Sequence, residues 1–255
     1  MLRYIQIGPN SFIPTYNLLV GTGIALAMLY LQYENTFKSK SEEYKQIIHL
    51  GLLVSMLVGF VGAYSFDAYT QGIPISFSTL TQIGLTFFGG LMAGLVFFVF
   101  YLKRYSFPVL ETLNLLTPSF CVAHSVGRVG CFCAGCCFGA LTDSVLGVKF
   151  PLVSIPSLHF QQEAQIYPTQ LFESAFVLLV LIFIFLTKSK NKFFIYIISY
   201  SIFRFLIEFI RGDNRGELFN QNLLTPSQFI SILMFTTAIL AITVMNFLPP
   251  KTVDT

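Results

Sequence analysis

Seven apolar segments, each about as long as a helix that crosses a bilayer, recur along this chain. They cover residues 16–33, 47–63, 82–101, 107–129, 169–187, 193–210 and 228–247. An α-helix needs roughly 20 residues to cross a hydrocarbon core of about 30 Å. Only 11% of the residues are charged, whereas soluble domains carry about 25%. We therefore predict an all-α polytopic membrane protein with about seven transmembrane helices, forming a single domain over residues 1–255.

Basic residues are unevenly distributed over the loops between these segments. One side of the predicted membrane holds nine of the fifteen: Lys38, Lys40, Lys45, Lys103, Arg104, Lys188, Lys190, Lys192 and Lys251. The other side holds Arg3, Lys149, Arg211 and Arg215. Because cytoplasmic loops carry an excess of Lys and Arg, we predict that the N-terminus lies outside and the C-terminus in the cytoplasm. The chain that follows Gly139 would then lie outside too.

Four polar residues interrupt the sixth apolar segment at helical spacing. They are Tyr200, Arg204, Glu208 and Arg211, and on a helix they share one face. An arginine in a span costs about 2.5–3.5 kcal/mol on insertion scales, so such residues are usually paired or functional. One interpretation is a set of structural salt bridges, Arg204 with Glu208 and Glu208 with Arg211. We favour the other, an anion site at the outer headgroups, because a guanidinium can bind phosphate oxygens in a bidentate fashion.

A second buried cation, Arg128, lies between Gly127 and Gly130 at the end of the fourth segment. Glycines there let the backbone bend or let a ligand approach closely. If Arg128 meets Arg204, Glu208 alone cannot neutralise both charges. We expect a bound anionic lipid to supply the missing charge.

The stretch YPTQLFES, residues 167–174, opens the fifth segment. Pro168 suits the first turn of a helix, and Glu173 near a helix N-terminus is favoured by the helix dipole. Gln170 lies one turn before Glu173. We interpret this patch, taken alone, as a helix-start signal.

Four cysteines, Cys131, Cys133, Cys136 and Cys137, form a C-x-C-x2-C-C pattern, and Cys121 precedes them. A zinc site, a disulfide or redox couple, and a covalent lipid-carrying nucleophile are each open. One short segment seldom supplies all four zinc ligands, so we expect no metal. We favour small residues in a tight helical segment, because small side chains let transmembrane backbones approach closely.

Several motifs in register resemble those of the prolipoprotein diacylglyceryl transferase family of bacterial inner-membrane enzymes. The similar stretches are IGP at 7–9, PTYNLLVGTGIALAM at 14–28, FGGLMAG at 88–94, GRVGCFCAGCCFG at 127–139, YPTQLFE at 167–173, YSIFRFLIEFIR at 200–211 and LTPSQFIS at 224–231. The resemblance covers nearly the whole chain. The order and spacing of the motifs agree with the seven-span layout.

The resemblance implies a reaction and a place for it. The family transfers the diacylglyceryl group of phosphatidylglycerol to the lipobox cysteine of a preprolipoprotein, forming a thioether and releasing glycerol phosphate. We therefore expect two partners, phosphatidylglycerol or another anionic phospholipid and a preprolipoprotein signal peptide. The multi-pass chain would act at the outer leaflet of the inner membrane. The net charge of +3 is too small to indicate nucleic-acid binding. Nothing in the sequence suggests an organic cofactor.

The resemblance also assigns candidate residues. Those matching the family's motifs are Tyr16, Arg128, Gly139, Tyr200, Arg204, Glu208 and Arg211. By analogy, Arg128 and Arg204 would hold the lipid phosphate and stabilise charge on the leaving group. We add Gly130 and Gln170 as further candidates for substrate binding.

Three departures from the family's motifs concern the activation of the acceptor thiol. Phe88 replaces the motif histidine, and Cys131 and Cys136 replace the signature asparagine and glutamate. Phe cannot accept a proton. His124, one helical turn before Arg128, is a candidate base, although a hydrogen-bonded core histidine is an equal interpretation. Two other functions stay open: a membrane thiol–disulfide oxidoreductase built on the cysteines, and a non-catalytic anionic-lipid binder or transporter.

Overall fold

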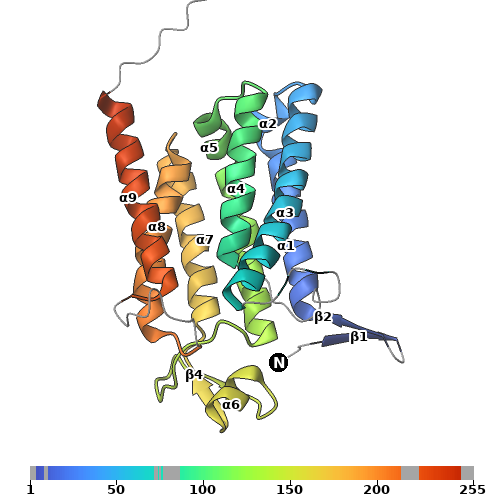
Figure 1. The fold of residues 1–255 in the computed structure, drawn as a ribbon, viewed down its shortest axis with the longest axis vertical. Coiled ribbons are helices and arrows are strands. Elements are labelled where there is room, and N and C mark those ends of the chain that lie inside the picture. Colours follow the sequence, from blue (N-terminus) through green and yellow to red (C-terminus); the bar gives the residue numbers. More distant parts are fainter. Residues whose placement is uncertain are drawn as a thin grey trace, which may run out of the picture. The chain divides into compact units, whose positions relative to one another are not determined.

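The computed structural model describes residues 4–8, 11–71, 74, 76, 87–213 and 224–247. The helices are α1 (Thr15–Tyr33), α2 (Asn35–Lys38), α3 (Glu42–Gln71), α4 (Phe87–Arg104), α5 (Val109–Ala134), α6 (Ile155–Phe160), α7 (Thr169–Thr187), α8 (Lys192–Ile207), the 3-10 helix η2 (Glu208–Ile210) and α9 (Pro226–Phe247). Two short antiparallel sheets pair β1 (Tyr4–Gly8) with β2 (Ser11–Pro14), and β3 (Val148–Phe150) with β4 (Ala164–Ile166). The fold is mostly helical (Figure 1).

Each of the seven predicted segments falls on one of these helices, although residues 82–86 lie outside the described residues. Helix α7 has the predicted bounds, whereas α5 continues five residues past the predicted end. Four described segments are long and apolar enough to cross a membrane: Glu42–Phe66, Thr169–Thr187, Lys192–Ile210 and Pro226–Phe247. The chain is thus a mostly helical protein with membrane-spanning segments, while the number seven and the orientation stay predictions.

The two strand pairs were not predicted, because the sequence analysis expected helices only. Strands β3 and β4 pair Val148 with Ile166 and Phe150 with Ala164. They close a small apolar core with Phe138. A connection between membrane helices must still satisfy its backbone N–H and C=O groups, and pairing two strands does so.

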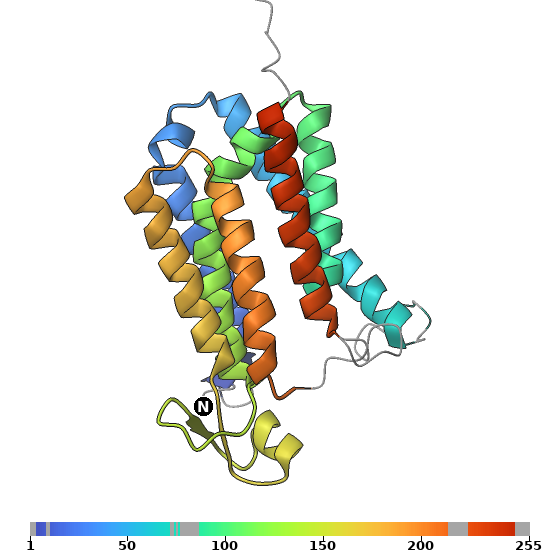
Figure 2. The same ribbon diagram turned by 90° about the vertical axis from the view of Figure 1, so that its left-hand side faces the viewer.

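Contacts divide the chain into two compact units, one made of Met1–Leu31 and Leu116–Thr255, the other of Gln32–Leu115. In the first unit, α5, α7 and α8 share an apolar core built from Cys121, Val177, Val180, Leu181, Ile184, Tyr196 and Tyr200. Helices α7 and α8 run side by side, and β4 and α6 lie beyond the N-terminal end of α7 (Figures 1 and 2). The single domain over residues 1–255 stays a prediction.

In the second unit, α3 packs on α4 through a seam of glycines (Figure 1). A Cβ atom placed on Gly59 would lie 3.0 Å from the carbonyl oxygen of Gly90, and one placed on Gly90 would lie 2.9 Å from that of Gly59. The pair Gly62 and Gly89 repeats this arrangement at 2.9 and 2.8 Å. Small residues thus let the two backbones approach closely, as is common between transmembrane helices.

Candidate active site

The first turn of α7 is fastened to the chain that follows α5. Thr169 Oγ1 donates a hydrogen bond to the carbonyl oxygen of Cys137 (2.8 Å), and Gln170 Nε2 donates one to that of Cys136 (2.6 Å). Pro168 is the N-cap of the helix and begins it without a side-chain cap. These bonds set the position of Glu173, whose side chain is completely buried.

The Glu173 carboxylate is the centre of a buried charged network. Its Oε1 atom lies 2.7 Å from Arg128 Nη2 and accepts a hydrogen bond from the Tyr200 hydroxyl at 2.6 Å. Its Oε2 atom lies 3.9 Å from Arg204 Nη1. One carboxylate on α7 therefore ties α5 to α8, and buried ion pairs of this kind are costly to break from one side.

Arg204 extends the network to α9. Its Nη2 atom lies 3.0 Å from Glu208 Oε2 and donates a hydrogen bond to Ser227 Oγ at 2.9 Å. Thr225 Oγ1 donates to Glu208 Oε1 at 2.9 Å. The predicted pairing of Arg204 with Glu208 is confirmed.

The predicted pairing of Glu208 with Arg211 is wrong for the described residues. Arg211 binds Asp213 instead, with Nε at 2.8 Å and Nη2 at 2.7 Å from the two carboxylate oxygens. Helix α8 ends at Ile207 and a 3-10 turn follows. The backbone of Arg211 is extended. The helical spacing that would have aligned Arg211 with Glu208 is therefore lost. Burial alone would lower the pKa of Arg211, but the hydrogen bonds and charge of Asp213 raise it above its usual range.

Arg128 and Arg204 do come together, across Glu173. The expectation that only Glu208 could neutralise them is wrong, because Glu173 supplies the second carboxylate. The described residues thus balance these two cations without a bound lipid. The interpretation of Glu173 as a helix-start signal missed its role as the carboxylate between the two arginines. The signal that could have found it is the pair of buried arginines, which together require two carboxylates.

Two arginines, Arg204 of this network and Arg211 beside Asp213, keep unused N–H groups. The Nη1 atoms of Arg204 and Arg211 are buried and have no hydrogen-bond partner among the described residues. The 3.9 Å separation of Arg204 Nη1 from Glu173 is too long for a hydrogen bond. Buried donors are usually satisfied, so unused ones mark a place where an acceptor can bind. The oxygens of an anion can accept hydrogen bonds from these N–H groups without any side chain changing its protonation state.

His124 lies behind Arg128 and is built into the network. Arg128 Nε approaches His124 Nε2 at 3.4 Å, and His124 Nδ1 lies 2.9 Å from the Tyr196 hydroxyl. His124 Nε2 also lies 3.7 Å from Glu173 Oε1, so the ring contacts Arg128, Tyr196 and Glu173. This geometry gives His124 the hydrogen-bonded role. Its role as a general base stays a prediction. The side chain of Phe88, the residue in place of the family's motif histidine, lies outside the described part of the structure.

Tyr16 lies against the end of α5. A Cβ atom placed on Gly130 would lie 3.4 Å from the Tyr16 ring and 3.5 Å from its carbonyl oxygen. Tyr16 keeps 40% of its surface exposed. Around Gly127, no described atom lies within 4 Å of an added Cβ. Gly130 is therefore packed against Tyr16, whereas Gly127 has open space beside it.

Gly139 lies where three stretches of backbone cross. Its N–H donates to the carbonyl oxygen of Tyr167 (3.0 Å), and the next residue, Ala140, donates to that of Ile210 (2.8 Å). A side chain on Gly139 would collide with Tyr167 and would crowd Ile210. Gly139 is therefore required by packing, and it holds the chain that carries Arg211.

The cysteines lie where α5 ends. Gly135 adopts a left-handed conformation (φ 76°), Cys136 N–H donates to the Cys131 carbonyl (3.2 Å), and Gly135 N–H donates to that of Phe132 (3.1 Å). This is a Schellman cap, which brings residues C3 and C″, here Cys131 and Cys136, together. The predicted helical segment holds for Cys131 and is wrong for Cys136, which lies past the helix.

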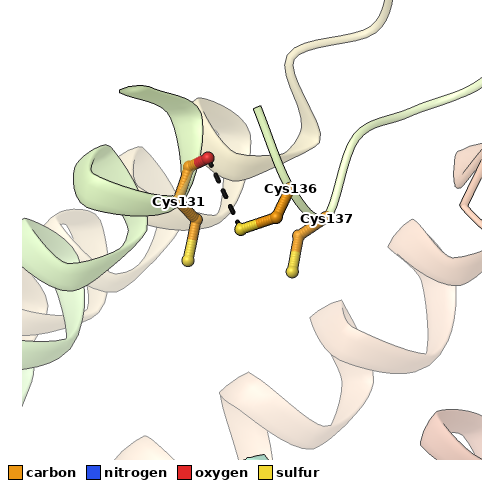
Figure 3. Close-up of side chains that lie close together, drawn as sticks. All are labelled: Cys131, Cys136 and Cys137. Carbon is orange, nitrogen blue, oxygen red and sulfur yellow. Dashed lines mark hydrogen bonds between the residues drawn. The ribbon is translucent and has the colours of Figure 1, made fainter. Parts of the chain in front are cut away.

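The sulfur atoms of Cys131, Cys136 and Cys137 all lie within 4.8 Å of one another (Figure 3). The Cys136 thiol also lies 3.7 Å from the Cys131 carbonyl oxygen. Hydrogen bonds with the thiols of Cys131 and Cys137, together with burial, raise the pKa of Cys136 well above its usual range.

Comparison with known proteins agrees with the resemblance in the sequence. Residues 3–244 match the model of a family described as prolipoprotein diacylglyceryl transferase. The chain is 30% identical over 240 residues to a phosphatidylglycerol–prolipoprotein diacylglyceryl transferase of Clostridium tetani, covering 91% of each chain. It is 31% identical over 234 residues to the enzyme numbered 2 of Clostridium perfringens, covering 89% of this chain and 88% of the other. A Prochlorococcus marinus enzyme of the same name is 28% identical over 257 residues. The chain belongs to the prolipoprotein diacylglyceryl transferase family.

Proposed function

We propose that this protein transfers the diacylglyceryl group of phosphatidylglycerol to the cysteine thiol of a prolipoprotein. The relatives in Clostridium and Prochlorococcus carry the name of that activity. The observation that carries the proposal is the pair of buried, unused guanidinium N–H groups on Arg204 and Arg211. Arg204 lies in a network whose charges are already balanced, and the charge of Arg211 is balanced by Asp213.

The lipid phosphate would be held by these guanidiniums. Its oxygens would accept hydrogen bonds from the unused N–H groups of Arg204 and Arg211. Glu173 would hold Arg128 nearby. Planar guanidinium groups suit phosphate because they donate two parallel hydrogen bonds. Tyr200 of α8 holds the Glu173 carboxylate, and Glu208 of η2 holds Arg204.

The reaction breaks the bond between the glyceryl carbon and the phosphate oxygen and forms a bond from that carbon to the thiol sulfur. Glycerol phosphate leaves with the negative charge that develops on its oxygen. Fixed cations in a site shielded from water stabilise such developing charge most effectively. The acceptor thiol loses its proton to a base, for which His124 is our candidate.

We further propose that the chain is a multi-pass protein of the bacterial inner membrane, with its N-terminus outside. The excess of Lys and Arg on one side of the predicted spans supports this orientation. It places Arg211 and Gly139 at the outer leaflet. A thiol-labelling or protease-accessibility map of the loops in whole cells tests it.

The proposed reaction is tested by a lipidation assay. Purified protein is mixed with phosphatidylglycerol vesicles and a synthetic lipobox peptide, and mass spectrometry measures the diacylglyceryl adduct on the peptide cysteine. Arg128→Ala and Arg204→Ala should each lower the rate by about a hundredfold or more, as removal of a charge-stabilising donor does. Lys149→Ala is the matched control, since it removes an exposed cation on β3 of the same unit.

Two results would contradict the proposal. One is an unchanged rate in folded Arg128→Ala protein. The other is folded wild-type protein that binds phosphatidylglycerol without forming any adduct, which would support the lipid-binder alternative.

A further inference from the structure

The three clustered cysteines differ from the core cysteine of the same unit. Cys121 is completely buried among apolar side chains of α5, α7 and α8. Cys131, Cys136 and Cys137 are partly exposed, and their sulfur atoms lie within 4.8 Å of one another. Small apolar packing accounts for Cys121 but leaves the clustering of three partly exposed thiols unexplained.

The local backbone sets the cluster. The Schellman cap at Gly135 places the Cys131 and Cys136 side chains next to each other. Cys137 then adopts a left-handed backbone conformation (φ 62°), which is uncommon for a residue with a side chain. In Figure 3 the Cys136 side chain points toward Cys131, and its sulfur atom lies between those of Cys131 and Cys137. The Cys137 backbone is also held by Thr169 of α7.

The spacing of the sulfur atoms suits a metal ion. Zinc–sulfur bonds are about 2.3 Å long, so three sulfurs around one ion lie roughly 4 Å apart. The cluster needs to contract by less than about 1 Å to reach that geometry, starting from 4.8 Å at most. Soft thiolate ligands select thiophilic ions such as Cu(I) and Zn(II).

The surrounding charges suit the complex that would form. Three thiolates with one Zn(II) carry a net charge of −1, and with Cu(I) a charge of −2. The guanidiniums of Arg128 and Arg211 interact electrostatically with thiols of the cluster. A metal ion displaces the thiol protons when it binds, and the two nearby cations would stabilise the anionic metal–thiolate complex.

We propose that Cys131, Cys136 and Cys137 form a three-thiolate site for a soft, thiophilic metal ion, Cu(I) or Zn(II), at the C-terminal end of α5. The sequence alone argued against a metal because one short segment seldom supplies four ligands. The fold supplies three from this segment, which leaves a further coordination position for an exogenous ligand in the case of Zn(II). The proposal is independent of the transferase activity.

The test is a metal titration of reduced full-length protein in detergent micelles. Co(II), used as a spectroscopic substitute for Zn(II), reports thiolate ligation through sulfur-to-metal charge-transfer absorption, and a competing chelator gives the affinity. A second titration uses Cu(I). Binding of one equivalent is expected, and the tighter of the two ions identifies the ion for which the site is suited.

The chain offers matched control variants. Cys136→Ser, Cys137→Ser and Cys131→Ser should each weaken binding by about tenfold or more, since even loss of an outer-shell partner costs that much. Cys121→Ser and Cys133→Ser, which alter cysteines outside the cluster, should leave the affinity unchanged. Wild-type protein that binds neither ion, or equal affinity in all five variants, would overturn the proposal.

A second measurement needs no variant. Bound metal should protect Cys131, Cys136 and Cys137 from alkylation while Cys133, also partly exposed, is still modified. Peptide mass spectrometry counts the modified thiols with and without the metal. Equal labelling of the three cysteines in both conditions would contradict the site even if a cysteine variant failed to fold.

Discussion

Two helix packings in this molecule differ in whether they bury charge between the helices. Helices α3 and α4 meet through glycines, and carbonyl oxygens of the facing helix lie only 2.8–3.0 Å from where a Cβ would be. Helices α5, α7 and α8 share an apolar core and are also linked through Glu173, which is buried between Arg128 and Tyr200. The first packing relies on close contact between backbones, whereas the second adds a buried charged network to an apolar core.

The difference indicates which packing serves chemistry. Close backbone contact holds transmembrane helices together without any buried charge. Buried ion pairs pay a desolvation cost that often exceeds their attraction, so they are weak evidence for stability and stronger evidence for a site. The unused N–H groups belong to Arg204 and Arg211, which lie in the unit that buries charge.

The largest effect is expected from Glu173→Gln. This change leaves Arg128 without the carboxylate that lies 2.7 Å away, and breaking one partner of a buried pair costs about 3–5 kcal/mol. We expect a large drop in the thermal midpoint of the detergent-solubilised protein and loss of lipidation activity. Glu163→Gln is the control, because Glu163 is an exposed carboxylate of the same unit. Equal stability of the two variants would show that charge does not hold α5, α7 and α8 together.

The second-largest effect is expected from Gly139→Ala. The added Cβ would collide with Tyr167 where three backbone stretches cross, and overpacking of this kind costs about 1–3 kcal/mol. Because the same crossing positions Arg211, activity should fall with stability. Gly127→Ala, where no described atom lies within 4 Å of the new Cβ, should leave the thermal midpoint unchanged or slightly raised. A neutral Gly139→Ala would contradict the packing argument.

Gly62→Ala tests the seam of α3 and α4. Its Cβ would collide with Ala93 and lie 2.9 Å from the carbonyl oxygen of Gly89, so we expect a loss of about 1–2 kcal/mol. The second substitution Ala93→Gly should recover part of the loss, since it removes one of the two conflicts. Gly21→Ala in α1, with no described atom within 4 Å, is the control. Thermal midpoints are measured for the wild type, the two single variants at Gly62 and Gly21, and the double variant. No recovery in the double variant would argue against direct contact between positions 62 and 93.

The smallest effect is expected from Ser227→Ala. It removes an acceptor 2.9 Å from Arg204 Nη2, while Glu208 keeps its contact with the same atom. Hydrogen bonds between membrane helices are worth about 1 kcal/mol, so a few-fold decrease in kcat/KM is expected. Ser231→Ala, one turn along α9, removes only a bond to its own helix backbone. The two variants should differ in activity more than in stability, and equal activity would rule out a role for Ser227 at Arg204.

Local patterns in the sequence predicted the helices well. All seven apolar segments correspond to helices, because hydrophobicity over 20 residues is a property of the segment itself. The pairing of Arg204 with Glu208 was predictable for the same reason, since residues four apart share a helical face. The late end of α5 was also predictable, because Gly135 is a typical residue just after a helix.

Interactions between distant segments were not predictable in this way. The role of Glu173 depends on α5, α7 and α8 meeting, which no local pattern specifies. The partner of Arg211 depends on where α8 stops being helical. Gly139 is required only because Tyr167 and Ile210 cross it.

The sequence by itself determined the class of the protein, a helical membrane chain, and through motifs in register it indicated the family. Both depend on residues that are close together in the chain. The tertiary structure alone decided that Glu173 balances Arg128 and Arg204, that two arginines keep unused N–H groups, and that the thiol of Cys137 joins those of Cys131 and Cys136. These arrangements depend on distances between side chains, which become fixed only when packing brings separate segments within a few ångströms.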